Sequence, residues 1–193
     1  MVIAIDGPGG SGKSTLAAAL ADRLALDRLD TGAMYRAVAL AALRNGVAPE
    51  DGAGVGALAG RARIEVEGST VRLDGEDVSG AIRSAPVTRA ASAVARHPEV
   101  RGELVARQRA WVAARGGGVV EGRDIGTVVC PDADLKLYLT ASPHERARRR
   151  SAELGAAEEP EVSSVAEELA HRDRSDATRA ASPLDRAPGA VEI

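Results

Sequence analysis

The sequence has 193 residues, of which 45% are hydrophobic and only 2% aromatic, with no phenylalanine. This length accommodates one α/β domain with an insertion or two, and the core must be built from Ala, Val, Leu and Ile. The formal net charge of −3 argues against a broad basic face for nucleic acid or membranes, so any anion must be bound locally.

The N-terminus and the few Cys and His residues argue against a secreted or membrane protein, an internal disulfide and a structural metal site. Met1 leads straight into VIAID, without the charged and long apolar segments of a signal peptide or a membrane span, so we expect a cytoplasmic protein. Cys130 is the only cysteine, which leaves it no partner for an internal disulfide. His97, His144 and His171 have no metal-ligand spacing, and we expect no structural metal.

The first predicted elements are a strand over Val2–Ile5 and a helix that begins after Gly12. The sequence between them fits the pattern G-x-x-x-x-G-K-[ST], which turns backbone N–H groups and a helix N-terminus toward a phosphate. Lys13 would reach the β- and γ-phosphates as a compact charge, and Ser14 would offer its hydroxyl to Mg²⁺. The predicted phosphate-binding loop comprises Gly7, Pro8, Gly9, Gly10, Ser11, Gly12, Lys13, Ser14 and Thr15.

A phosphate-binding loop does not identify the phosphoryl acceptor. Three classes stay open at this point: a small-molecule or nucleotide kinase, a GTPase-like switch, and an ATPase or nucleic-acid motor. A kinase that acts on a phosphorylated acceptor needs a second anion site, because two polyanions must meet in line. The arginines beyond the loop are the residues to consider for that site.

The stretch LDRLDTGAMYRAVALAALRNG predicts a strand, a turn at residues 30–32 and a helix that ends at Asn45-Gly46. Arg36 would be the first cation to face a cleft, although an Arg on a helix surface is more often solvated. Farther along, residues 62–84 alternate apolar and polar positions around Gly68, which predicts an antiparallel hairpin. We interpret residues 62–91 as an inserted subdomain; an edge hairpin without a binding role is the alternative.

Pro98 begins a long predicted helix that ends at residues 116–118. Arg101 lies in its first turn, where a positive charge opposes the helix dipole, so an electron-rich partner would explain it better than helix stability. A buried strand at residues 119–120 is followed by Glu121, Gly122, Arg123 and Asp124, at the end of the strand where ligands gather in parallel sheets. A further strand is predicted at residues 135–140.

The sequence SPHE at residues 142–145 is a capping box with Pro at the first helical position, so a helix begins there. It carries Arg146, Arg148, Arg149 and Arg150, which are either solvated or part of a lid that folds over a nucleotide. A second capping box at residues 164–167 favours the lid. One face of the helix that follows carries Arg172, Asp176 and Arg179. These residues either form a stripe of salt bridges or bind a ribose phosphate.

Taken together, these motifs make the chain resemble the bacterial cytidylate kinases, nucleoside monophosphate kinases of the P-loop class. The likeness rests on IDGPGGSGKST, LDTGAMYR, LDGEDVSGAIRS, residues 92–101, EGRDIGTVV, PDADLKLYLTAS and HRDRSDATRAASPL, which run almost from end to end. The resemblance implies a P-loop NTPase-type parallel β-sheet core flanked by helices, with an inserted monophosphate-binding subdomain and a short lid. It also implies transfer of a phosphoryl group from ATP to CMP or dCMP with Mg²⁺, in a monomer that closes on both substrates.

Positions in the family's motifs imply roles for residues of this sequence. Ser92, Arg101 and Asp124 would read cytosine, whose N4 amine is a donor and whose N3 and O2 are acceptors. Thr31 and Asp176 would lie near base or ribose. Phosphate ligands would be Arg36, Arg123, Arg172 and Arg179, with Arg148 on the ATP. No general base is expected, and Lys13, Arg123 and Arg172 would be the catalytic cations.

The implied domain division is a P-loop core of residues 1–61, 92–147 and 164–193, an insert of residues 62–91 and a lid of residues 148–163. The runner-up function is a UMP/CMP kinase or another small-molecule P-loop kinase. Two features depart from the family's pattern. Cys130 stands where an aromatic residue is usual, and the pattern would continue past residue 193 through the rest of a strand, an Asp-Thr turn and a closing helix.

Overall fold

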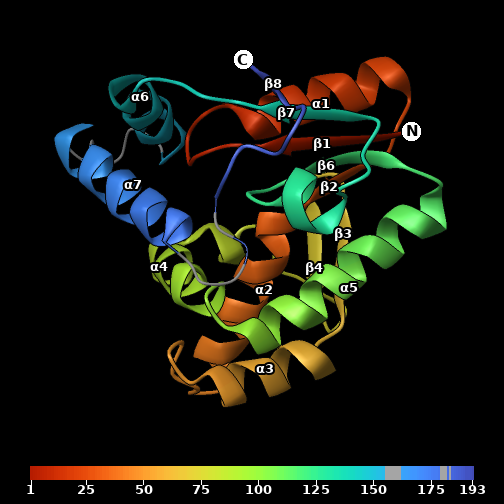
Figure 1. The fold of residues 1–193 in the computed structure, drawn as a ribbon. Coiled ribbons are helices and arrows are strands. Elements are labelled where there is room, and N and C mark those ends of the chain that lie inside the picture. The colour runs from red at the N-terminus through yellow and green to blue at the C-terminus, as the bar shows by residue number, and fades with distance from the viewer. Residues whose placement is uncertain (155–161, 179–181, 183) are drawn as a thin grey trace.

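The computed structural model describes residues 1–154, 162–178, 182 and 184–193, without the side chains of residues 153, 154, 162–164, 172 and 175. Its central feature is a sheet in which all pairs of neighbouring strands are parallel, in the order β2-β6-β1-β7-β8. The strands are β1 (Val2–Asp6), β2 (Arg28–Asp30), β6 (Gly118–Glu121), β7 (Leu135–Tyr138) and β8 (Val191–Glu192). This sheet and its helices confirm the predicted α/β class (Figure 1).

Side chains of β1 alternate between the two helical layers, as a pleated strand requires. Ile3 and Ile5 pack with α1 (Lys13–Leu24) through Ala17 and Ala21. Ala4 lies on the other face, in the core that contains α2 (Thr31–Arg44) and α5 (Pro98–Arg115). The strand is therefore covered on both faces, and its carboxyl end emerges between the layers (Figure 1).

Helix α2 is the most buried helix of this second layer, with residues 37–39 fully inaccessible to solvent. Its many alanines let α4 (Ala85–Val94) and α3 (Gly52–Arg61) approach closely, which is how a core without Phe reaches dense packing. The predicted turn at residues 30–32 is wrong, because β2 passes directly into α2. Asp30 caps the helix there, its Oδ1 accepting the Ala33 N–H at 3.1 Å.

The predicted hairpin is confirmed as β3 (Ile64–Glu67) and β4 (Thr70–Leu73), with Ile64 opposite Leu73 and Val66 opposite Val71. A two-residue strand, β5 (Glu76–Asp77), and a 3₁₀ turn, η1 (Ala81–Arg83), follow it. Arg44 on α2 donates two hydrogen bonds, at 2.7 and 2.9 Å, to the Glu76 carboxylate. The small antiparallel sheet is thereby attached to the helical layer beside the main sheet.

The second half of the chain adds a π-helical turn, η2 (Ile125–Val129), and the helices α6 (Pro143–Leu154) and α7 (Val162–Ala177). The helix start at Ser142 is confirmed, since Ser142 Oγ accepts the Glu145 N–H at 3.3 Å. The Glu145 carboxylate, the other half of the predicted capping box, accepts from Arg148 and Arg149 instead. Helix α7 begins two residues before the predicted cap at Ser164. The centre of the predicted lid, residues 155–161, lies outside the described residues. Among the helices that the structure describes, none has the length and hydropathy to cross a membrane.

Candidate active site

A cleft of about 420 Å³ opens at the carboxyl ends of β1, β2 and β6. Its walls come from the phosphate-binding loop, the start of α2, the tip of the β3–β4 hairpin, α4 and α5. Most of the residues singled out in the sequence line it: Gly9, Gly10, Gly12, Lys13, Ser14, Thr15, Thr31, Arg36, Ser92, Arg101, Arg123, Asp124 and Asp176. Segments far apart in the chain therefore converge on one site, as ligand sites of parallel sheets do.

The phosphate-binding loop depends on glycine at both ends. Gly7 has φ 146°, and a Cβ there would lie 2.1 Å from the Leu139 carbonyl oxygen, so no other residue fits. Gly12 has φ 98° and precedes the first residue of α1, the helix whose N-terminus faces the loop. Lys13 Nζ donates to the Pro8 carbonyl at 2.8 Å. The loop thus has the turned backbone and the terminal lysine that phosphate binding requires.

Helices α6 and α7 contact the loop at Gly9. Asp173 Oδ1 accepts the Gly9 N–H at 3.2 Å, and Arg146 Nη1 donates to the Gly9 carbonyl at 3.1 Å. Arg146 and Asp173 also form an ion pair with each other. Arg146 is only 8% exposed, so it is not part of a solvated run of arginines. The Asp173 carboxylate keeps it at the loop, because a buried guanidinium needs an opposite charge.

The end of β6 brings a buried carboxylate next to the loop. Glu121 Oε2 accepts a hydrogen bond from Ser14 Oγ at 2.7 Å, while Oε1 has no hydrogen-bond donor among the described residues and lies 3.7 Å from Arg28 Nη1. Burial, followed by the nearby charge of Asp30, raises the pKa of Glu121 to about 7, although the hydrogen bond from Ser14 opposes the rise. This pair places two oxygen ligands at the mouth of the loop.

Arg123 joins three parts of the site. Its Nη1 donates to the Gly7 carbonyl at 2.5 Å, and its Nε lies 3.2 Å from Asp176 Oδ2 on α7. Its side chain is 15% exposed, so the guanidinium remains accessible from the cleft. Arg36 lies at the start of α2, with Nη2 3.6 Å from Asp30 Oδ2. Both arginines line the cleft.

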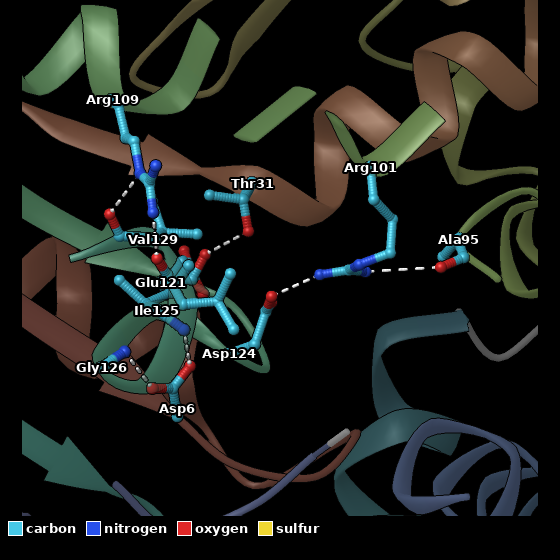
Figure 2. Close-up of polar contacts among 11 residues, drawn as sticks. Asp6, Thr31, Ala95, Arg101, Arg109, Glu121, Asp124, Ile125, Gly126 and Val129 are labelled. Carbon is cyan, nitrogen blue, oxygen red and sulfur yellow. Dashed lines mark hydrogen bonds and ion pairs between the residues drawn. The ribbon is translucent and has the colours of Figure 1, made fainter. Parts of the chain in front are cut away.

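The far end contains a buried ion pair between Arg101 on α5 and Asp124, which follows β6 (Figure 2). Their side chains are only 5% and 7% exposed. Arg101 Nη1 also donates to the Ala95 carbonyl at 3.3 Å, and its guanidinium lies 5.5 Å from the centre of the Tyr35 ring. The electron-rich partners expected for an Arg in a first helical turn are thus a carboxylate, a carbonyl and an aromatic face.

The turn that follows Asp124 is held at both ends (Figure 2). Asp6 on β1 accepts the N–H groups of Ile125 and Gly126, each at 2.8 Å. Burial raises the pKa of Asp6 to about 6, while these two hydrogen bonds lower it. Arg109 on α5 donates to the carbonyls at the other end of the turn, Val128 at 2.6 Å and Val129 at 3.1 Å. The turn directly after Asp124 is therefore tied to both β1 and α5.

Several residues singled out in the sequence do not line the cleft. Gly7, Pro8 and Ser11 belong to the back of the loop. Arg148 is exposed and donates two hydrogen bonds, both at 2.9 Å, to Glu145 on its own helix. Arg179 and the side chain of Arg172 lie outside what the structure describes. Thr31 lines the cleft, but its hydroxyl donates to the Glu121 carbonyl at 2.7 Å.

Four residues of the cleft wall were not singled out from the sequence: Arg28, Asp30, Tyr35 and Arg83. Glu121 and Arg150, which were named there without a site role, also line it. The position of Glu121 at the end of a buried strand was visible, but nothing in the sequence paired it with Ser14. Arg83 belongs to the predicted insert and Arg150 to the arginine run. Both segments were predicted to contact nucleotides, which was a signal for cations on the cleft wall. Among the described residues, no three His, Cys, Asp or Glu side chains form a group suited to a metal ion.

Comparisons with known proteins identify relatives of the chain. The model of a family described as "Cytidylate kinase" matches residues 3–193. The chain is 50% identical to a cytidylate kinase of Solibacter usitatus, over 100% of this chain and 84% of that protein. It is 51% identical to one of Geobacillus thermodenitrificans, over 99% and 87% of the two chains. A third, of Pelotomaculum thermopropionicum, is 54% identical, over 94% of this chain and 83% of that protein.

Proposed function

The chain belongs to the cytidylate kinase family and transfers a phosphoryl group from ATP to CMP and dCMP, and we propose that the cleft described above performs this reaction. In this assignment ATP places its phosphates on the loop at residues 7–15, and the acceptor nucleotide occupies the end that contains Arg101 and Asp124. The observation that carries the assignment is the convergence of both sets of residues on one cleft.

The base of CMP is proposed to lie against Ser92, Arg101 and Asp124. The Asp124 carboxylate would accept from the N4 amine of cytosine, and the guanidinium of Arg101 would donate to N3 and O2. Arg101 Nε is buried without an acceptor among the described residues, so the pair has donor capacity left for a ligand. Uracil has an oxygen where cytosine has its amine, and a buried carboxylate facing that oxygen disfavours UMP.

The acceptor phosphate is proposed to lie between the two ends, held by Arg36, Arg123, Arg172 and Arg179. Support comes from Arg36 and Arg123, which both line the cleft. Thr31 and Asp176, which also line the cleft, are assigned to the ribose or base. Two negatively charged substrates approach each other only where cations offset their repulsion, and these arginines are placed to do that.

ATP is proposed to bind through the N–H groups of the loop and through Lys13, with Arg148 reaching it from α6. Mg²⁺ would be held by the Ser14 hydroxyl and the ATP phosphates. The residues present fit this ion, because Ser14 and the unsatisfied Glu121 Oε1 are oxygen ligands beside the loop and Mg²⁺ needs only one or two protein ligands. When bound, the ion supplies positive charge that offsets the charge of the transferred group.

Catalysis is proposed to need no general base, since the acceptor is already a phosphate anion. Lys13, Arg123 and Arg172 would align the two phosphates and stabilise the charge that develops on the transferred group. Arg123 is suited to this role because its contacts with Gly7 and Asp176 fix its guanidinium while leaving it open to the cleft. These residues would therefore contribute by aligning the two phosphates and by offsetting negative charge where the two nucleotides meet.

The three-part division is proposed to serve this reaction: core residues 1–61, 92–147 and 164–193, insert 62–91 and lid 148–163. The hairpin tip and Arg83 line the cleft, which supports a binding role for the insert. We also propose that the protein acts as a monomer in the cytoplasm, where ATP meets its nucleotide acceptor.

The test is ADP production with ATP and Mg²⁺, comparing CMP, dCMP, UMP, AMP and GMP at equal concentration. Turnover with CMP and dCMP, and little with the purines, is expected. Comparable turnover with UMP would favour the alternative, a UMP/CMP kinase. No turnover with any acceptor, from folded protein that binds ATP, would contradict the assignment of the acceptor site.

A further inference from the structure

The turn that carries Asp124 has no cap of its own. Asp124 precedes η2 with φ −145° and ψ 27°, and its side chain accepts no hydrogen bond from the turn. An Asp before a helical turn commonly folds its carboxylate back onto the first free N–H groups. Here that carboxylate faces Arg101 instead (Figure 2).

Asp6 supplies the missing cap from a different strand. Its Oδ1 accepts the Ile125 N–H and its Oδ2 the Gly126 N–H, each at 2.8 Å, and its residue is only 3% exposed. Two carboxylate oxygens thus satisfy the two donors that follow Asp124. The neighbouring carbonyl of Ile5 accepts the Gly122 N–H at 2.9 Å, so β1 holds the segment before Asp124 as well.

We propose that Asp6 is a positioning residue for base selection: by capping η2 it leaves the Asp124 carboxylate available to pair with Arg101 and to read the pyrimidine. This inference rests on the proposed function. Asp6 also directly precedes Gly7, the first residue of the phosphate-binding loop. The end of β1 therefore leads into the loop proposed for ATP, while its Asp6 side chain caps the turn that follows Asp124.

Removing the Asp6 carboxylate has a defined consequence. The Ile125 and Gly126 N–H groups would be buried without their acceptors. The Asp124 carboxylate belongs to the residue directly before them, and it would cap them by leaving Arg101. Asp6→Asn keeps the size of the side chain, but its NH₂ group would face one of the two N–H donors. Asp124 would then turn toward the backbone and leave Arg101, and selection between cytosine and uracil would weaken.

The experiment measures kcat/KM for CMP and for UMP in the wild type, Asp6→Asn, Asp124→Asn and the double variant. Asp6→Asn is expected to lower the CMP to UMP ratio about tenfold or more while KM for ATP changes by less than about twofold. Adding Asp6→Asn to Asp124→Asn should leave the ratio unchanged, because both changes remove the same interaction. The control is Asp134→Asn, whose carboxylate accepts the Val2 N–H at 2.7 Å at the other end of β1.

An unchanged CMP to UMP ratio in Asp6→Asn, with both activities falling equally, would overturn the inference. A further fall of the ratio in the double variant would also overturn it. If Asp6→Asn does not fold, Asp6→Ser, which keeps one acceptor in a smaller volume, replaces it with the same outcomes. Turnover of CMP by the wild type tests the proposed function separately. If the wild type is active and Asp6→Asn has the same CMP to UMP ratio, only the role of Asp6 is refuted.

Discussion

The two ends of the cleft are built in different ways. The phosphate end is one continuous stretch, residues 7–15, and it uses backbone N–H groups and a helix N-terminus with one lysine. The base end is assembled from α4, α5 and the segment after β6, and it uses side chains. Its central contact joins Arg101 and Asp124, two residues that are 23 positions apart.

This difference determines what each end can do. Backbone groups recognise a phosphate, which every nucleotide carries, so the phosphate end cannot choose between bases. A buried pair of opposite charges has fixed donors and acceptors and can reject a base with the wrong pattern. The phosphate end should therefore govern rate, and the base end should govern which nucleotide is phosphorylated.

The largest effect is expected from Lys13→Ala at the phosphate end. Loss of the charge that meets the transferred phosphoryl group should lower kcat/KM about 10²- to 10³-fold for CMP and UMP alike. Steady-state ADP production with both acceptors measures this. Lys136→Ala, which removes the other lysine of the chain, should keep nearly full activity. A loss confined to one acceptor would contradict the division between the two ends.

Asp124→Asn addresses the base end. The CMP to UMP ratio of kcat/KM should fall about 10²-fold, because uracil would no longer face a carboxylate. Arg101 would also lose its ion-pair partner, so the unfolding free energy should fall by about 3 kcal/mol. Glu76→Gln is the control: it removes an exposed ion pair with Arg44, so neither the unfolding free energy nor the CMP to UMP ratio should change appreciably. An unaltered ratio in Asp124→Asn would rule out base reading by this residue.

A smaller effect is expected at the junction of the phosphate loop with α6 and α7. Asp173→Asn should raise KM for ATP about tenfold, since Gly9 and Arg146 lose a charged partner, and it should leave KM for CMP nearly unchanged. Initial rates over a range of both substrates separate the two constants. Glu192→Gln, which removes an exposed ion pair with Arg186 away from the cleft, is the control. Equal changes in KM for ATP and KM for CMP would contradict the prediction that this junction affects ATP binding only.

The last prediction concerns stability: ionisation of Asp6 should make the unfolding free energy depend on pH. Its pKa is about 6 in the folded protein and 3.8 when unperturbed, so its contribution to stability is complete below about 3.8 and is lost as the pH rises through 6. The unfolding free energy of the wild type relative to Asp6→Asn should fall by about 2–3 kcal/mol over that interval. Denaturant titrations between pH 4 and 7 test this, and a constant difference would contradict the raised pKa.

Sequence reasoning succeeded where the determinants are local. The glycine-rich loop between β1 and α1, the hairpin at residues 64–73 and the helix cap at Ser142 are short patterns whose geometry follows from neighbouring residues. The unfavourable position of Arg101 even indicated a missing partner, but nothing local named Asp124. Arg146 was one of four arginines in a charged run, and only the approach of α7 with Asp173 buries it. Contacts between distant elements are set by packing, which periodicity does not encode.

The most direct test of the division between the two ends is a crystal structure of the enzyme with CMP. The cytosine N4 amine should lie within about 3.2 Å of an Asp124 carboxylate oxygen, and N3 or O2 within the same distance of the Arg101 guanidinium. The phosphate should lie between Arg36 and Arg123, pointing toward the loop. A cytosine ring bound elsewhere, with the Arg101–Asp124 pair untouched by ligand, would contradict it.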